Sequence, residues 1–315
     1  WIAQHRAMRH EPLMGSGIWT WNEYWYNRGQ TECTAGPCID ACREAQVKEI
    51  FFTQWGDNGA YCDHDSAFAG MVFCADKCYG FDTPAADTLE RRMAAVCGGS
   101  YAMHLLASDL HGPVPGFRAS MWGDPLFETE FRTFAKDDPK IMTAVADACA
   151  ALAGKLKPRV RDRAVGDFRY AYGTAQALAD RYALAADLLA AYQKKNRRAL
   201  AAGRNRIPGV RRSVRNMADA FRAMWMRHNK PEGIETIQAR FGMLDERYRE
   251  LYTRLGEYLD GSIDHIAEWD NLCVPLAGKL KAGLVTARWS DVEATARQPK
   301  PSSITRARPP RKNMT

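Results

Sequence analysis

The sequence predicts an α/β segment followed by an all-α domain, and two patterns support this fold class. Over residues 1–98, short apolar runs alternate with helical stretches, which is the βαβα order of a parallel sheet. From about residue 138, apolar side chains recur every three or four positions, which is the spacing of amphipathic helices. A chain of 315 residues with 46% apolar content is long enough to bury a core in each part.

The elements of the α/β part follow one another closely. A helical stretch, WIAQHRAMRH, opens the chain, and a first short strand follows within residues 15–26, GSGIWTWNEYWY. Residues 37–48, PCIDACREAQVK, suit a helix that lies on a sheet. A second buried strand covers Ile50–Phe52, and another helical stretch covers Ser66–Cys78. The two strands of such a unit lie side by side or nearly so, with their carboxyl ends at the same edge of the sheet.

Both predicted strands end in tryptophans. The first run leads to Trp19 and Trp21, and the second, EIFFTQWGDNGAYC, leads to Trp55 and Asp57. Sugars need a flat apolar surface and a hydrogen-bond acceptor, because a pyranose has an apolar C–H face and a rim of hydroxyls. The strand ends therefore favour a carbohydrate site. The alternative interpretation is a core tryptophan followed by an Asp-Asn-Gly turn.

Four amphipathic helices are predicted after Asp138-Pro139, where proline occupies the first turn. Such helices bury their apolar stripes against one another as a bundle. Part of the long last stripe has a second interpretation, which is packing on another protomer. The four stripes consist of Ile141, Val145, Ala148, Leu152 and Leu156; of Leu178, Tyr182, Ala185, Leu189 and Tyr192; of Val214, Met217, Phe221, Met224 and Trp225; and of Ile234, Ile237, Phe241, Leu244, Tyr248, Leu251, Leu255 and Tyr258.

Breaks in these patterns divide the chain into four segments. Gly98-Gly99 and the run HGPVPG at 111–116 interrupt the helical pattern. Within the break, Trp122–Phe127, WGDPLF, predicts a proline-containing turn with aromatic anchors. The predicted segments are a partial α/β domain over 1–98, a connecting region over 99–137, a helical domain over 138–278 and a basic, proline-rich tail over 279–315.

The net charge of +7 comes mostly from the end of the tail, where residues 297–312 carry six basic side chains and no acid follows Glu293. This composition is typical of a disordered, solvated terminus, and nucleic-acid binding through the tail is the alternative. We expect no nucleic acid as a partner. No apolar run approaches the length of a membrane span, so we expect no membrane contact either.

The nine cysteines follow no regular framework. Their CxxxxC and CxxxC spacings are not accompanied by a paired CxxC or HxxxH, so we expect no metal site. Small buried hydrophobic residues are the simpler interpretation. Free thiols in this number favour a reducing compartment, which predicts a cytoplasmic location.

Three stretches resemble a known family. GSGIWTW, followed by FFTQWGDNGAYC, resembles the last two strands of the catalytic barrel of glycoside hydrolase family 20, in the branch of bacterial exo-β-N-acetylhexosaminidases with an α-helical C-terminal domain. FRAMWMRHNKPEGIETIQARFGMLDERY, from Phe221 to Tyr248, resembles that helical domain. The resemblance covers roughly residues 5–275. It implies the C-terminal part of a (β/α)8 TIM barrel, with strands seven and eight in residues 1–98, followed by an α-helical bundle.

The resemblance also implies an activity. Enzymes of the family remove terminal β-linked GlcNAc or GalNAc with retention, and the substrate's own acetamido group is the nucleophile. Their catalytic Asp-Glu pair ends the fourth strand, and the Asp245-Glu246 dipeptide of this chain falls inside a predicted helix instead. We therefore expect a C-terminal fragment with no catalytic residue of its own, inactive alone. A non-enzymatic carbohydrate-binding or oligomerisation module is the alternative.

Substrate-binding roles follow from the same resemblance. Trp55 is expected under the terminal N-acetylhexosamine ring, and Asp57, where most of the family has glutamate, is expected to bind the hydroxyls at O4 and O6. Trp19 and Trp21 are candidates for the acetamido pocket. Asn22 and Tyr24 are weaker candidates, since the strand ends in WTWN rather than the Tyr-x-Asp of many members. We expect no cofactor. We expect the protein to form a homodimer.

Overall fold

The computed structural model describes residues 1–21, 23–57, 61–80, 85–111, 121–126, 139–161 and 165–270. The chain forms two compact units. Both are assembled from segments far apart in the sequence. Unit 1 contains residues 1–112, 148–177 and 216–237, and unit 2 contains residues 113–147, 178–215 and 238–315.

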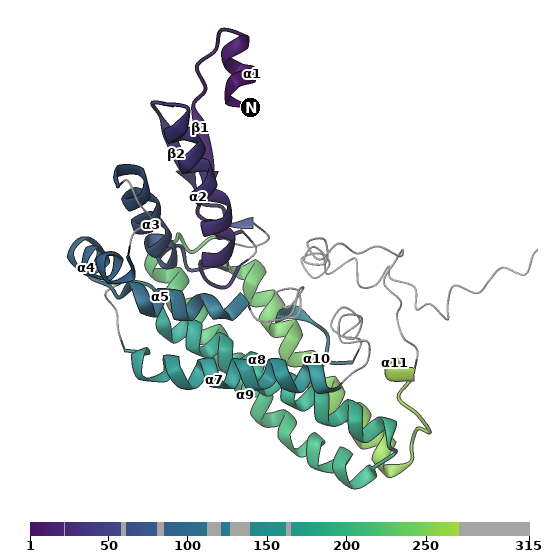
Figure 1. The fold of residues 1–315 in the computed structure, drawn as a ribbon. Helices are drawn as coiled ribbons and strands as arrows, with labels where there is room; N and C mark the ends of the chain where they lie inside the picture. The colour runs from purple at the N-terminus through teal and green to yellow at the C-terminus, as the bar shows by residue number, and fades with distance from the viewer. Residues whose placement is uncertain are drawn as a thin grey trace, which may run out of the picture. The chain divides into compact units, whose positions relative to one another are not determined.

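Unit 1 begins with a helix, α1 (Ile2–Ala7), and a β–α–β element (Figure 1). Strands β1 (Met14–Gly17) and β2 (Ile50–Thr53) pair in parallel, with Met14 opposite Ile50 and Gly17 opposite Thr53. This pairing confirms the predicted parallel arrangement. In the part of the chain that the structure describes, these two strands are the whole sheet. A complete barrel is therefore not among the described elements.

Helix α2 (Arg28–Glu44) connects the two strands and begins earlier than the predicted helix over 37–48. Asn27 caps it, because its side-chain oxygen accepts a hydrogen bond from the backbone N–H of Gln30 at 3.0 Å. Pro37 lies inside the helix rather than at its start. The apolar pattern alone marks only the second half of α2, since the first half is polar, and the cap decides the true beginning.

Five short helical elements complete the described N-terminal part of unit 1. Gly98 ends α4 in the left-handed conformation, with φ of 73°, which confirms the break predicted there. The connecting region that the sequence predicts over 99–137 contains a further helix, α5. The elements are η2 (His64–Ala67) with α3 (Phe68–Tyr79), α4 (Ala86–Cys97), α5 (Tyr101–Ala107) and η3 (Ser108–His111).

The four predicted amphipathic helices are present as long helices (Figure 1). Each contributes residues to both units. Their bounds are α7 (Pro139–Leu156), α8 (Phe168–Gln193), α9 (Arg197–His228) and α10 (Ile234–Asp260), with the short η5 (Lys157–Arg159) and α11 (Ala267–Asp270) beside them in the chain.

The predicted apolar stripes of α9 and α10 are confirmed. Every stripe residue of α9 is buried, and so is the α10 stripe from Ile234 to Leu255, with Tyr258 half-buried. The long stripe of α10 is thus core within this chain. The prediction for α7 is wrong at Ala148, which is exposed, because Cys149 takes the inward position. Helix α8 is buried on most sides, so a single stripe describes it poorly.

The core of unit 1 joins the segment after β1 to the beginning of α8. Trp25 is fully buried, with its ring centroid 5.4 Å from that of Phe168 and 5.6 Å from that of His104. Its indole Nε1 donates to the His104 carbonyl at 2.9 Å. The Tyr170 hydroxyl donates to the Tyr61 carbonyl at 2.8 Å. These aromatic contacts fix the loop that follows β1 on a helical base.

In unit 2, the WGDPLF segment is held by aromatic and arginine contacts. Trp122 is buried and meets Phe241 edge-on at 4.9 Å between centroids. The buried Arg181 of α8 donates to the carbonyls of Met121 and Gly123. These contacts confirm the prediction of a turn with an aromatic anchor at Trp122, whereas Phe127 lies outside the described residues.

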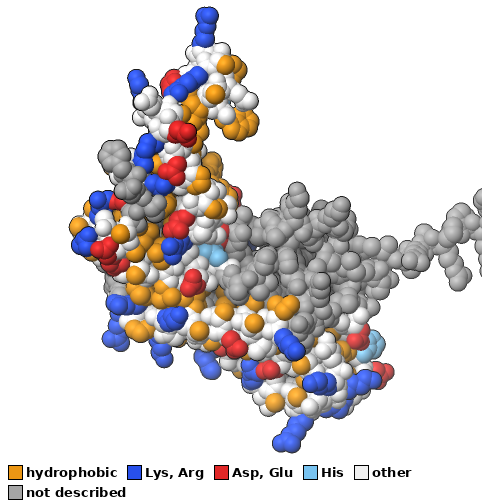
Figure 2. All heavy atoms as spheres, in the orientation of Figure 1, with side chains coloured by type: hydrophobic (Ala, Val, Ile, Leu, Met, Phe, Trp, Pro, Cys, Tyr) orange, Lys and Arg blue, Asp and Glu red, His pale blue; other side chains and the backbone are white. Residues whose placement is uncertain are grey.

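Hydrophobic side chains lie on the surface around α1, β1 and β2 (Figure 2). They include Trp1, Met8, Leu13 and Phe51. Among the described helices, none has the length and apolar character needed to cross a membrane.

Candidate functional site

Three tryptophans gather at the carboxyl ends of β1 and β2. The ring centroids of Trp19 and Trp21 are 4.4 Å apart, and those of Trp21 and Trp55 are 6.4 Å apart, with a tilt of 34° in each pair. The parallel register produces this cluster, because Gly17 opposite Thr53 brings the two strand ends to the same level. We call these three residues the indole cluster.

Trp21 occupies the middle of the indole cluster and lies on the backbone of β1. A Cβ atom added at Gly17 would be 2.2 Å from Cη2 of Trp21, so the ring fills the space that a side chain would need. The absence of a side chain at Gly17 is therefore what lets Trp21 reach Trp55.

Trp55 is the most exposed member of the indole cluster, with 51% of its surface accessible. Its backbone is bound by the Thr20 hydroxyl, which donates to the Trp55 carbonyl at 2.8 Å and accepts from the Trp55 N–H at 3.1 Å. Its indole Nε1 donates to the Thr53 hydroxyl at 3.0 Å. An exposed indole held in this way offers an apolar face to a ligand.

The remaining predicted site residues are placed differently. Asp57 is exposed, two residues beyond Trp55. Tyr24 lies in the interior of unit 1, fully buried, with its ring centroid 5.8 Å from that of Tyr61, so its hydroxyl does not join the indole cluster on the surface. Asn22 lies outside the described residues.

Glu23, which follows the indole cluster in the sequence, forms a polar pair with His111 that was not predicted. Glu23 is fully buried, and its Oε2 is 2.7 Å from Nδ1 of His111. Nε2 of His111 is 3.2 Å from the Tyr26 carbonyl, which can only accept, so Nε2 carries a hydrogen. The pair fastens the loop after Trp21 to η3, and 88 positions separate its members in the sequence, where no pattern links them.

Three described side chains have the spacing of a cation site. The ligand atoms of Asp63, Asp65 and His228 all lie within 4.8 Å of one another. Each has a protein partner, however. The Asp63 carboxylate accepts from the backbone N–H groups of Asp65 and Asp167, and Nε2 of His228 is 3.3 Å from Asp65. We therefore assign these residues to a polar cluster that joins η2 to α8 and α9 within unit 1, and the expectation of no metal stays a prediction.

The cysteines of the described residues are thiols, and four of the eight are buried. Burial raises the pKa of both Cys74 and Cys149 to about 12, so these thiols stay protonated near neutral pH. They act as small hydrophobic residues, as predicted.

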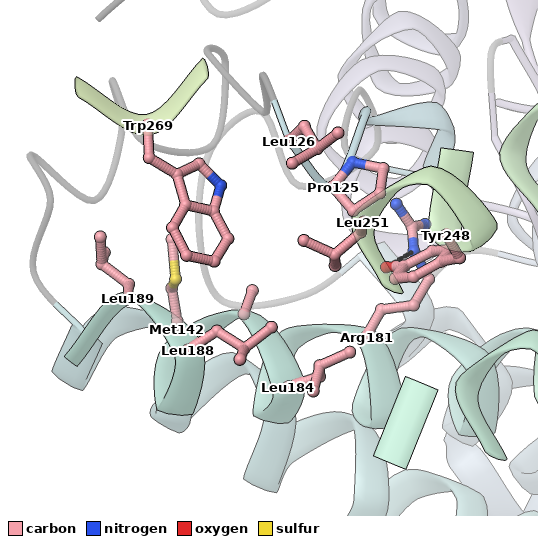
Figure 3. Close-up of a pocket in the computed structure, with 11 residues that line it drawn as sticks. Pro125, Leu126, Met142, Arg181, Leu184, Leu188, Leu189, Tyr248, Leu251 and Trp269 are labelled. Carbon is pink, nitrogen blue, oxygen red and sulfur yellow. Dashed lines mark hydrogen bonds between the residues drawn. The ribbon is translucent and has the colours of Figure 1, made fainter. Parts of the chain in front are cut away.

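A small cavity lies in unit 2, between the Pro125-Leu126 segment and α8 (Figure 3). Its volume is about 30 Å³, which holds no more than one water molecule. Five leucines are among the residues that line it, and Arg181 and Tyr248 close one end with a hydrogen bond of 3.0 Å. A sugar does not fit into this cavity.

Aromatic side chains thus lie at the ends of two parallel strands, and long helices follow them in the chain. Residues 120–285, slightly more than half of the chain, match the family of the Glycoside Hydrolase 20C C-terminal domain. The chain belongs to this family, and with it to the glycoside hydrolases. No curated protein shows a significant match to the chain.

Proposed function

We propose that the indole cluster and Asp57 bind the terminal N-acetylhexosamine of a β-linked glycan. The observation that carries the proposal is the exposed face of Trp55, held beside Trp21 at the carboxyl ends of two parallel strands in a glycoside hydrolase 20 chain. The apolar C–H face of the sugar would stack on this indole. Asp57, which is exposed, would accept hydrogen bonds from the outer hydroxyls at O4 and O6.

In this proposal the strands β1 and β2 are strands seven and eight of a TIM barrel. Parallel sheets are ordinarily covered on both faces, and a two-stranded sheet is marginal by itself. The exposed Phe51 of β2 and Leu13 before β1 are in keeping with further strands beside them. Residues at the ends of the barrel strands would together form the sugar site.

The reaction proposed for the complete site is retaining, substrate-assisted hydrolysis. The acetamido oxygen of the sugar attacks the anomeric carbon, the bond to the leaving oxygen breaks, and an acid protonates that oxygen. Trp19 and Trp21 would hold the acetamido group close to the anomeric carbon, which favours the attack. The catalytic Asp-Glu pair is not supplied by Asp245 and Glu246, because Arg211 and Arg215 bind Asp245, and Arg249 binds Glu246.

Two further proposals concern the oligomeric state and the cellular location of the protein. We propose a homodimer on the resemblance alone, since the α10 stripe is already buried within the chain. We propose the cytoplasm because the described cysteines are free thiols, which a reducing compartment preserves.

Binding of N-acetylglucosamine to the 315-residue chain tests the proposed function. We expect Trp55→Ala to weaken binding at least tenfold, because it removes the stacking surface. Trp1→Ala is the matched control, since Trp1 is an exposed tryptophan outside the indole cluster, and it is expected to leave binding unchanged. Equal affinity of the Trp55→Ala variant and the unmodified chain, measured by calorimetric titration, would refute the proposal.

A further inference from the structure

We propose that Thr20 and Thr53 are positioning residues that hold Trp55 ready to stack on the sugar. The proposal rests on the proposed function of Trp55. Both residues act through their hydroxyl groups, Thr20 on the backbone of Trp55 and Thr53 on its indole.

Thr20 extends the connection between the strands beyond the end of the β-ladder. The ladder ends at the pair Gly17 and Thr53, with a last hydrogen bond from the Ile18 N–H to the Thr53 carbonyl at 2.9 Å. Past this point the buried Thr20 hydroxyl binds both polar groups of the Trp55 backbone, since a hydroxyl can donate once and also accept. Two bonds to one residue fix both the distance and the direction of its backbone.

Thr53 fixes the plane of the indole. Its Oγ1 lies 3.4 Å from the Ser16 carbonyl, which can only accept, so the hydroxyl hydrogen points to Ser16. A lone pair of Oγ1 then faces the Trp55 Nε1–H, which donates to it at 3.0 Å. Because this N–H is already bound, the sugar meets the indole face, and recognition of the sugar hydroxyls falls to other groups such as Asp57.

The arrangement matters because Trp55 is half exposed. An exposed side chain without such bonds samples several rotamers, and ordering it on binding reduces affinity. Trp19 is also held by a threonine, because its backbone N–H donates to the hydroxyl of the buried Thr31 at 2.8 Å.

Valine substitution removes each hydroxyl while nearly preserving the shape of the side chain. The Trp55 indole N–H signal in a ¹⁵N NMR spectrum, assigned with a Trp55→Phe variant, reports its hydrogen bond directly. We expect Thr53→Val to shift this signal upfield and speed its exchange with solvent. Thr20→Val and Thr53→Val should each weaken N-acetylglucosamine binding about 3- to 10-fold, as expected for the loss of one or two hydrogen bonds.

Serine variants at both positions should restore the indole signal and the affinity, because serine keeps the hydroxyl. Thr253→Val, on the exposed side of α10, is the control and should change neither. If Thr20→Val fails to fold, Thr53→Val still decides the question, since Thr53 is partly exposed. An unchanged Trp55 signal and unchanged affinity in Thr53→Val would overturn the positioning role.

The two proposals can fail separately. If the unmodified chain binds no N-acetylglucosamine, the proposed function fails, while the Trp55 indole signal in the valine variants still measures the positioning role. If the unmodified chain binds the sugar and the valine variants bind it equally well, the positioning role fails alone.

Discussion

The exposed indole of Trp55 is available for binding, whereas the hydroxyls of Thr20 and Thr53 hold it in place. Thr20 contributes through its hydroxyl, and Gly17 contributes through the lack of a side chain. Asp57, by contrast, has no support of this kind in the described residues, and its role depends on the ligand alone.

The role of Asp57 can be tested with a sugar that lacks one hydroxyl. We expect Asp57→Ala to weaken N-acetylglucosamine binding about tenfold, because a charge-assisted hydrogen bond is lost. The 4-deoxy analogue should bind the unmodified chain more weakly than N-acetylglucosamine, and Asp57→Ala should not distinguish the two sugars. Equal discrimination by both proteins would show that the carboxylate does not bind O4.

The raised pKa of Asp63 predicts how the stability of the protein depends on pH. Burial raises the pKa of Asp63 from its ordinary 3.8 to about 6. The hydrogen bond from the backbone N–H of Asp167 and the charge of His228 lower this pKa, whereas the charges of Asp65 and Asp167 raise it. The folded state therefore favours the protonated acid. Its contribution to stability is full below about pH 4 and is lost as the pH rises through about 6.

An asparagine at position 63 removes this titration. The difference in free energy of unfolding between the unmodified chain and Asp63→Asn should change by up to about 3 kcal/mol between pH 4 and pH 7, with the variant gaining on the unmodified chain as the pH rises. Urea titrations at both pH values measure it. A difference that does not vary with pH would mean that Asp63 is ionised throughout.

At the scale of elements, strand β1 combines two tasks. It pairs with β2, and its glycines leave room for aromatic rings above it, since a Cβ atom at Gly15 would be 2.6 Å from the ring of Phe51. Hydrophobic residues would make a more stable strand by propensity, so the glycines are better explained by the rings that lie on them.

Gly17→Ala should displace Trp21 from the indole cluster. We expect a loss of about 1–3 kcal/mol in the free energy of unfolding and a change in the near-UV circular dichroism of the tryptophans. Gly154→Ala is the matched control, because nothing lies within 4 Å of the added methyl group in α7, and it should be neutral or slightly stabilising. An unchanged near-UV spectrum in Gly17→Ala would contradict the placement of Trp21.

At the same scale, Arg181 of helix α8 is expected to contribute strongly to stability. Arg181→Met should lower the free energy of unfolding by about 3 kcal/mol, because it leaves the carbonyls of Met121 and Gly123 without their buried donor. Arg206→Met, which breaks the exposed ion pair with Asp187, should cost at most about 1 kcal/mol. Similar urea midpoints for the two variants would show that Arg181 does not anchor the segment.

For the whole molecule, the proposed function predicts that the 315-residue chain binds the sugar but does not hydrolyse a glycoside. The 315-residue chain should not hydrolyse 4-nitrophenyl N-acetyl-β-D-glucosaminide, because its Asp245-Glu246 dipeptide lies in α10 with arginine partners. Release of nitrophenol by the pure protein would place catalytic carboxylates within these residues. Activity abolished by Glu246→Gln but kept by Glu235→Gln would then identify the dipeptide itself.

The sequence by itself determined the helices of the C-terminal part, the two short strands and the family. These follow from local patterns, because a helix or strand shows its buried face at a fixed interval along the chain. The three tryptophans could also be assigned to one place, since parallel strands present their carboxyl ends at one edge. The inward position at Ala148 was mistaken because Cys149 satisfies the same spacing almost equally well.

Only the tertiary structure decided which groups hold the site. The hydroxyls of Thr20 and Thr53, the pair of Glu23 with His111 and the burial of Tyr24 depend on contacts between residues that are distant in the chain, or on which way a loop turns after a strand ends. Hydrophobic periodicity carries no information about such contacts, because hydrogen bonds of single polar groups are fixed by distance and direction in space rather than by spacing in sequence.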